Sequence, residues 1–446
     1  MPTLLVALLV LLAPGLQAAA APDPLQDEPG PWLEGSLSNG LSYVLVDAPL
    51  MSQQVLFTLL PWGLLDDGAG QTQLAHLAEH VLVRSVDPAM DDLMVDGIMV
   101  QGETMALTLR LETYAPPDRW RKALGWHADW LAGRALSEEA LRLGLPRERA
   151  QVVTEVELST RSSFTHKWAL AAWNQVLRHG ATHVEVLGAV NDVSREVLAS
   201  ELAARVVPGP DVFFVSVGPV PQAEVLEAMQ ERLGKLPAKA PRHAVSGLSP
   251  EQVREVSARE ATWDLPLGHY MEWYLMPDEG PLDRVAADAL SAIINHRIAQ
   301  RGSLTQAGVQ ATAVADLITP EGRWMLLTAS LPKPEDEALV RRVLGEIVGG
   351  LDALPEAGLV VGQMSSQLGE WPDFRLLRES LASQPGVEWI EAMQTLFLLY
   401  AQINMGLSHS ELPGAYSGLS AEFLQAFARE HMLPARRSEL LLTTGG

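Results

Sequence analysis

Two histidines and a glutamate stand close together in the otherwise apolar segment LAHLAEHVL, Leu74–Leu82. Residues four apart on a helix project from one face, so His76 and His80 would lie side by side, with Glu79 pointing the same way. Neutral imidazoles are good zinc ligands, and a carboxylate beside the metal can take a proton from water as a general base. The spacing predicts an H-x-x-E-H zinc site with Glu79 as the base. Two helix histidines satisfied by water or by core partners are the structural alternative.

A catalytic zinc keeps three protein ligands, so the motif needs one more. The segment GAGQTQLAHLAEHVL resembles the zinc-site helix of the pitrilysin/insulinase metallopeptidases, a family that includes the mitochondrial processing peptidases. The resemblance implies a third ligand about 75 residues further on, in a helix reading roughly E-R-x-V-I-x-x-E. Here ERAQVVTE runs from Glu148 to Glu155, and Glu155 is 75 residues after His80 (155 − 80). The resemblance therefore implies Glu155 as the third zinc ligand and Glu148 as a glutamate that supports catalysis.

Helix geometry agrees with this choice of glutamates. Glu148 and Glu155 are seven residues apart, about two helical turns, so both face one way, whereas Glu157 points nearly opposite. Glu148 could orient a ligand or the water. Taken without the histidine motif, the same glutamates would read as a solvated helix face. The ligand types favour zinc over manganese or cobalt.

The resemblance covers nearly all of the chain beyond the first 21 residues but departs from the family in a strand. Active relatives carry G-G-x-x-N-A-x-T, in a strand along which the peptide lies. Here GIMVQGET keeps Gly97 and Thr104 but has Ile98, Gln101 and Gly102. Main-chain pairing with an extended peptide can survive these changes, because it uses backbone groups.

The second departure concerns an Arg and a Tyr that hold substrate in the family, in R-x-x-x-G-L-x-Y. The aligned stretch LTQAGVQA keeps Gly308 but has Leu304 and Ala311 at the Arg and Tyr positions. Amide hydrolysis needs donors aimed at the developing oxyanion, so this chain alone lacks part of the machinery. Some bacterial relatives divide the zinc motif and the Arg/Tyr pair between two chains. We therefore expect a homologous partner subunit, in a homo- or heterodimer.

The elements that must position these residues fall into two halves. Strand and helix patterns run up to a Pro-, Ala- and Gly-containing segment, 236–250, with the composition of a linker, and the element order then begins again. The pattern predicts an α+β protein with a zinc-binding domain at 22–235 and a domain without metal at 251–446. The resemblance implies that each domain is a mostly antiparallel sheet packed with helices. One helix of the second half is predicted at 386–403.

The first 21 residues have the pattern of a secretory signal peptide. Leu4–Leu12 form an apolar core too short to span a bilayer, and small residues follow at Ala18–Ala21. An uncleaved membrane anchor and a buried N-terminal helix are the alternatives. The sequence contains no cysteine and therefore no disulfide, which fits export to a bacterial periplasm. No later segment is long and apolar enough to span a membrane once the signal is cleaved.

The chain is acidic, with 32 Lys and Arg residues against 55 Asp and Glu residues, a formal net charge of −23. This balance argues against binding of nucleic acid, whose phosphates need a basic surface. It weakly favours basic peptides as substrates, although solubility alone would explain it.

His127, His166 and His269 have no second histidine at helical spacing. His179 and His183 are four residues apart, but Gly180 is expected to end the helix between them. All five are interpreted as ordinary surface or core residues. Two functions remain. The first is a zinc-dependent endopeptidase that hydrolyses peptides or unfolded segments. The second is a binding or assembly subunit that retains zinc but cleaves little; the missing Arg/Tyr pair favours it, and the intact Glu79 opposes it.

Overall fold

The computed structural model describes most of the chain between residues 32 and 444. The predicted signal peptide, most of the predicted linker and the helix predicted at 386–403 lie outside the described residues. The described ranges are 32–49, 51–84, 95–133, 138–162, 166–180, 189–238, 258–263, 265–319, 322–369 and 411–444.

The first half contains a six-stranded sheet with the order β1-β2-β6-β3-β5-β4. β2 and β6 are parallel, and every other neighbouring pair is antiparallel. β4 therefore forms one edge of the sheet. The strands are β1 (Trp32–Ser36), β2 (Ser42–Asp47), β3 (Gln54–Leu60), β4 (Met99–Thr104), β5 (Leu109–Ala115) and β6 (Phe213–Gly218).

The second half repeats this arrangement in a five-stranded sheet with the order β7-β11-β8-β10-β9. β7 and β11 are parallel and the other pairs are antiparallel, which matches the order β2-β6-β3-β5-β4 of the first sheet strand by strand. The predicted α+β class and the similarity of the two halves are confirmed. The strands are β7 (Ala258–Trp263), β8 (Gly268–Met276), β9 (Ala311–Thr319), β10 (Gly322–Leu331) and β11 (Arg437–Thr444).

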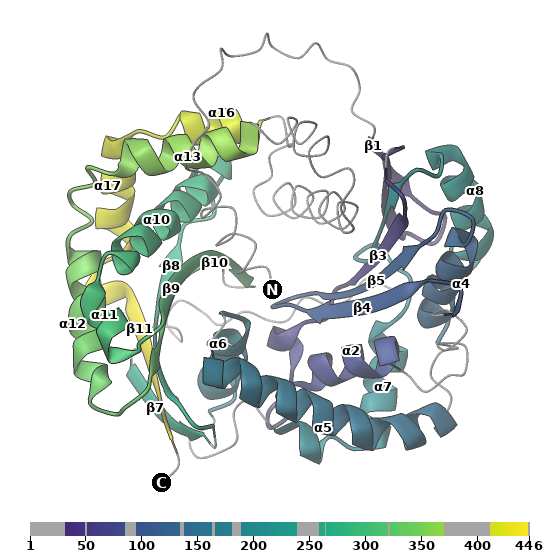
Figure 1. Cartoon of the computed structure of the whole chain (residues 1–446), viewed down its shortest axis with the longest axis horizontal. Coiled ribbons are helices and arrows are strands. Elements are labelled where there is room, and N and C mark those ends of the chain that lie inside the picture. The colour runs from purple at the N-terminus through teal and green to yellow at the C-terminus, as the bar shows by residue number, and fades with distance from the viewer. Residues whose placement is uncertain are drawn as a thin grey trace.

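Helices pack around both sheets (Figure 1). In the first half these are α2 (Leu74–Arg84), α4 (Trp120–Leu131), α5 (Glu138–Ser162), α6 (His166–Trp173), α7 (Arg195–Arg205) and α8 (Gln222–Arg232). In the second half they are α10 (Pro281–Ala299), α11 (Gly302–Ala307), α12 (Asp336–Gly349), α13 (Ala357–Gly369), α16 (Leu412–Ser417) and α17 (Ala421–His431). Single turns occur at η1 (Leu64–Asp66), η2 (Asn174–Arg178), η3 (Ala189–Asp192) and η5 (Pro434–Arg436). No helix among the described residues is both long and apolar enough to cross a membrane.

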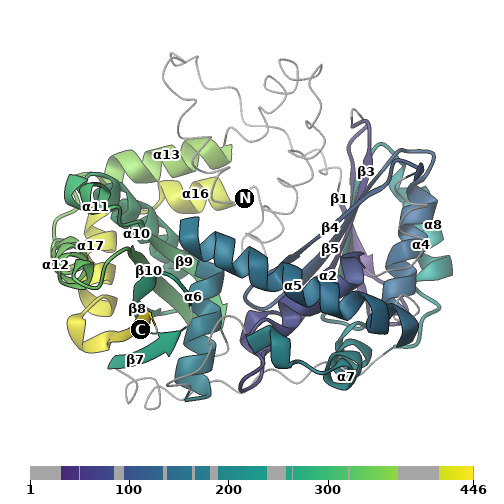
Figure 2. The same ribbon diagram turned by 60° about the horizontal axis from the view of Figure 1, so that its bottom comes forward.

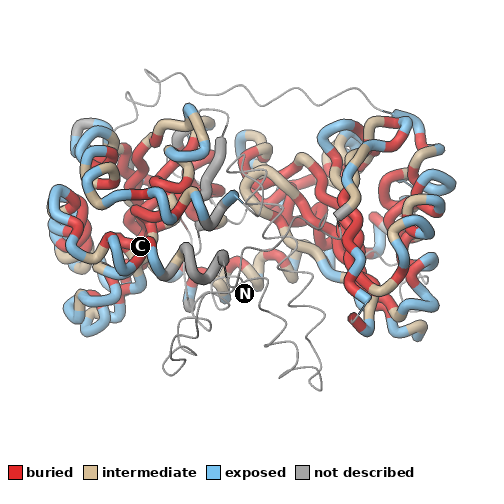
Figure 3. Tube along the Cα trace, turned by 90° about the horizontal axis from the view of Figure 1, so that it is seen from above, coloured by how far each residue is buried: buried red, intermediate tan, exposed pale blue. Residues whose placement is uncertain are grey.

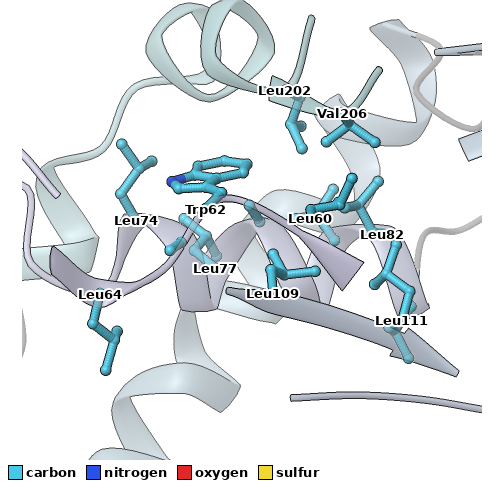
Figure 4. Packing of buried hydrophobic residues seen from close by; sticks show 14 of the residues in the cluster. Leu60, Trp62, Leu64, Leu74, Leu77, Leu82, Leu109, Leu111, Leu202 and Val206 are labelled. Carbon is cyan, nitrogen blue, oxygen red and sulfur yellow. The ribbon is translucent and has the colours of Figure 1, made fainter. Parts of the chain in front are cut away.

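The core of the first half lies between its sheet and α2. Alternate residues of a strand point to one face, so Leu60 of β3 and Leu109 of β5 meet the leucines of α2 there. Trp62 is fully buried in this layer, among side chains from β3, α2 and α7 (Figure 4). Buried residues follow both sheets along the chain trace (Figure 3). Burial of α2 on nearly all sides fixes the helix that carries the histidine motif.

The two halves meet at α6, which lies between α5 and the second sheet (Figure 2). Its Trp173 contacts Trp273 of β8 and Trp324 of β10, with ring centroids 6.5 and 5.8 Å apart. All three tryptophans belong to the same buried cluster as the core of the first half. Apolar packing therefore continues from one half into the other, and these tryptophans serve packing. The domain boundary at 236–250 stays a prediction.

His127 of α4 lies in the core of the first half as a neutral side chain. Its Nδ1 is 2.7 Å from Thr58 Oγ1 and its Nε2 is 3.0 Å from Thr113 Oγ1, so two hydroxyls satisfy both ring nitrogens. Burial lowers the pKa of His127 to about 3. Burial also lowers the pKa of His269, on β8, well below its usual value. Both are core histidines, as the sequence predicts.

We expect the free energy of unfolding to fall as the pH drops below about 6.5, the pKa of an unfolded histidine. Below that pH only the unfolded chain protonates His127. The contribution of buried, neutral His127 to the free energy of unfolding is therefore complete above that pH and is lost as the pH falls toward 3. At pH 5.5 the loss is about 1.4 kcal/mol for each such histidine. Urea unfolding at pH 7.5 and 5.5 measures it. A His127→Gln variant should lose less between the two pH values, and an equal loss would contradict the assignment.

Candidate metal centre

The helix α2 begins at a cap supplied by the preceding loop. The carboxylate of Asp67 accepts hydrogen bonds from the backbone N–H groups of Gln73 (2.9 Å) and Ala75 (3.0 Å). These N–H groups lie at the helix N-terminus, where no intrahelical acceptor exists for them. The loop is itself fixed by Asn174, whose side-chain amide donates to the carbonyl of Asp67 at 3.0 Å. The start of the motif helix is therefore set by contacts from distant residues.

The three predicted ligands converge, with their ligand atoms all within 4.8 Å of one another. Nε2 of His80 lies 3.3 Å from Oε2 of Glu155, and Nε2 of His76 lies 3.6 Å from Oε1. The two imidazoles come from successive turns of α2 and meet edge to face at 4.8 Å. Glu155 comes from α5, which packs along α2 (Figure 1). Both histidines are buried, whereas the side chain of Glu155 is 43% exposed, so solvent reaches the site on the Glu155 side.

The second nitrogen of each histidine has its own partner. Nδ1 of His76 is 2.9 Å from Oε1 of Gln73, and Nδ1 of His80 is 3.4 Å from Oε2 of Glu148. An oxygen acceptor at Nδ1 holds a ring proton there, so that Nε2, which faces Glu155, can offer its lone pair to a metal once its own proton has left. Metal-ligating histidines commonly have such a partner on the other nitrogen.

The electrostatics of the site favour positive charge. Hydrogen bonds from His76 and His80 hold the pKa of Glu155 far below its usual value. Burial works against protonation of His80, but its hydrogen bonds to Glu148 and Glu155 outweigh burial and raise its pKa to about 9. Burial lowers the pKa of His76. Two imidazoles and a carboxylate form a donor set with a net charge of −1 when the imidazoles are neutral, which fits a divalent ion such as zinc.

Glu79 is held beside this group by β4. Thr104 Oγ1 donates to Oε2 of Glu79 at 2.9 Å, and the carboxylate is 8% exposed. A Cβ added at Gly102 would stand 2.7 Å from Cγ of Glu79 and 2.8 Å from a methyl of Val83, so only glycine lets β4 approach this closely. Glu79 is not one of the three residues whose ligand atoms converge, but its charge acts on both imidazoles.

Glu148 contacts a ligand, so its geometry gives it a positioning role. It is fully buried, with Oε2 toward His80 and Oε1 2.7 Å from Nε of Arg147. Glu157 points away and pairs with Arg161 at 3.8 Å on an exposed face, as helix spacing predicts. No pattern in the sequence pointed to Gln73, Asp67 or Trp168. The ring of Trp168 lies 5.5 Å from that of His76. Their contacts depend on how the loop and α6 fold back onto α2.

The positions of the missing Arg/Tyr pair lie around the end of α11. Leu304 is buried in α11, and Gly308 ends the helix with a left-handed φ of 73°, a conformation that glycine adopts readily. Ala311 begins β9. Apolar side chains therefore stand at the two positions that the family resemblance aligns with an Arg and a Tyr.

The fold is similar to that of several peptidases of known structure. A protease from Helicobacter pylori matches with a TM-score of 0.68 and 15% identity, over 92% of this chain and 99% of that chain. A predicted insulinase family protease from Yersinia pestis matches with a TM-score of 0.60 and 16% identity, over 97% and 96%. The periplasmic protease PqqL from Escherichia coli gives 0.63 and 15%, over 95% of this chain but 48% of PqqL. No family sequence model matches the chain, and no curated protein matches it by sequence.

These neighbours define the fold as that of two-domain peptidase-like α+β proteins. More closely, it is the pitrilysin/insulinase-like fold, as the resemblance of the histidine and glutamate segments implied. The likeness at such low identity concerns the fold, and the chemistry must be argued from the side chains.

We expect the purified protein to bind one zinc ion per chain. Partners of a zinc ligand are worth about 10- to 100-fold in affinity, so loss of the direct ligand in Glu155→Gln should cost more than about 100-fold. Metal analysis after dialysis and competition with a chelator measure both values. Glu157→Gln, on the opposite face of the same helix, is the matched control and should bind as the wild type does. Equal zinc binding by Glu155→Gln would rule out this ligand set.

Proposed function

We propose that this chain is a zinc-dependent endopeptidase that hydrolyses peptides or unfolded segments. His76, His80 and Glu155 hold the zinc, and Glu79 acts as the general base. The observation that carries the proposal is the convergence of both Nε2 atoms on the Glu155 carboxylate, with oxygen acceptors behind each Nδ1. A structural zinc would have no use for Glu79 beside it.

A residue of this chain, Glu79, carries out the proton transfers. Zinc bound there contributes Lewis acidity and eases deprotonation of water. Glu79 takes a proton from the water that attacks the peptide carbonyl and gives it to the departing amide nitrogen. The hydroxyl of Thr104 occupies Oε2 of Glu79, which leaves Oε1 to carry the proton. Glu148 holds His80 in the orientation and tautomer that binding requires.

The substrate is proposed to be an extended peptide that pairs with β4. An edge strand offers backbone N–H and C=O groups to an added strand, and β4 has one neighbour in the sheet, β5. Gly102 and Thr104 of β4 contact or hold Glu79, so a peptide on this edge would pass close to the base. The net charge of −23 gives a weak preference for basic peptides.

A homologous partner subunit is proposed to complete the site. Leu304 and Ala311 cannot donate hydrogen bonds from their side chains to an oxyanion, and loss of one such donor alone typically costs about 100- to 1,000-fold in rate. The match to PqqL covers 48% of that protein, which is about twice as long as this chain. A second chain of the same fold would give an assembly of comparable size. The proposed assembly is a homodimer or a heterodimer.

The second candidate is a subunit that retains zinc but serves in binding or assembly. The apolar side chains at Leu304 and Ala311 favour it. Glu79, kept beside the site by a hydrogen bond and a glycine contact, opposes it.

Measurements of peptide turnover test the proposal. The three samples are the chain alone, the chain with a co-purified homologous partner, and the same pair carrying Glu79→Gln. We expect turnover mainly with the partner, and a loss of about 100- to 10,000-fold for Glu79→Gln at unchanged zinc content. Glu157→Gln is the control. Equal turnover with and without the partner would refute the division of labour, and no turnover in any arm, with zinc bound, would favour the binding subunit.

We also propose that the chain is exported to the periplasm and cleaved near residue 21. The apolar run Leu4–Leu12, the small residues Ala18–Ala21 and the absence of cysteine support this, as does the match to a periplasmic protease. N-terminal sequencing of the protein from a periplasmic extract should give a start close to Ala21. A start at Met1 in the membrane fraction would instead support an uncleaved anchor.

A further inference from the structure

Gln73 has a backbone conformation that side-chain-bearing residues rarely adopt. Its φ is +73°, and among the described residues no other non-glycine residue has a positive φ. The conformation is fixed from both sides: the N–H donates to Asp67 Oδ2 at 2.9 Å, and the carbonyl accepts from the N–H of Leu77 at 2.8 Å. A glycine would meet these demands without strain. The glutamine therefore calls for a reason beyond the loop itself.

Besides the backbone strain, the side chain of Gln73 has an unfavourable feature of its own. Gln73 is fully buried, and its Nε2 amide has no hydrogen-bond partner among the residues that the structure describes. Buried amides are normally satisfied, so each exception needs an explanation. The oxygen of the same amide lies 2.9 Å from Nδ1 of His76. Turning the amide over would direct an N–H at Nδ1 and force the ring proton onto Nε2, the atom that faces Glu155.

We propose that Gln73 is a positioning residue for His76, retained to hold the ring proton on Nδ1 and the Nε2 lone pair toward the metal. The inference rests on the proposed zinc site and adds a residue to it. Glu148 has the corresponding role for His80, so each histidine has one oxygen partner, the first from the loop before α2 and the second from α5. Trp168 packs 5.5 Å from the His76 ring and limits its movement on another side.

Three variants test this role by readouts that do not need turnover: zinc affinity by chelator competition, and the melting temperature of the metal-free protein. Gln73→Gly keeps the left-handed backbone and removes the acceptor, so it should melt no lower than the wild type yet bind zinc about 10- to 100-fold more weakly. Gln73→Glu keeps an acceptor oxygen and should bind within about threefold of the wild type or more tightly, as in carboxylate–histidine–zinc triads. Gln71→Gly adds a glycine to the same loop without contacting His76 and should not change affinity.

The outcomes separate this inference from the function on which it rests. A wild type that binds no zinc overturns the proposed function. If the wild type binds zinc and Gln73→Gly binds it within about threefold of the same affinity, only the positioning role is overturned. Loss of a hydrogen-bond partner of a zinc ligand is expected to lower the zinc affinity about tenfold or more. If Gln73→Gly both melts at a lower temperature and binds zinc more weakly, the Gln73→Glu variant decides between the two explanations. Zinc affinity restored in Gln73→Glu supports the positioning role. Zinc affinity that stays low in Gln73→Glu shows that the side chain serves packing and overturns the positioning role.

Discussion

The packing of α5 along α2 is the constraint on which the site depends. α2 presents two imidazoles on one face, but a pair of histidines is an incomplete ligand set until Glu155 arrives from a helix more than 70 residues later. The α2 helix has almost no freedom to move, since Leu74 through Val83 are all buried. Close packing resists small displacements, so the relative position of the two helices fixes the ligand geometry.

Burial of the histidines makes their partners necessary. A buried imidazole that must present Nε2 to a cation needs an acceptor for its Nδ1 proton, and leaving it unpaired would cost about 1–3 kcal/mol. Glu148 supplies one acceptor and is neutralised by Arg147. Gln73 supplies the other, in a left-handed conformation that costs a non-glycine residue about 1–2 kcal/mol. Glu155, the proposed third ligand, has a partly exposed side chain and needs no such support.

The two halves share a strand order but differ in chemistry. In both sheets the last strand of the half inserts between the first and second of the repeated strands and runs parallel to the first. Only the first half carries the histidine and glutamate group among the described residues. The second half has apolar side chains at Leu304 and Ala311, and it contributes packing through Trp273 and Trp324 against α6. A repeated scaffold thus holds one chemically equipped half and one that supports it.

The sequence by itself determined the helix with His76, Glu79 and His80 on one side, because residues three and four apart share a helix face and this spacing is local. It also determined the strands and helices with clear apolar periods and the repeated element order. Glu155 needed the family spacing, since nothing local distinguishes it from a solvated glutamate. Only the tertiary structure decided the partners of the histidines and the parallel insertion of β11, which join residues far apart in sequence. Such contacts depend on the path of the chain in space, which no local pattern records.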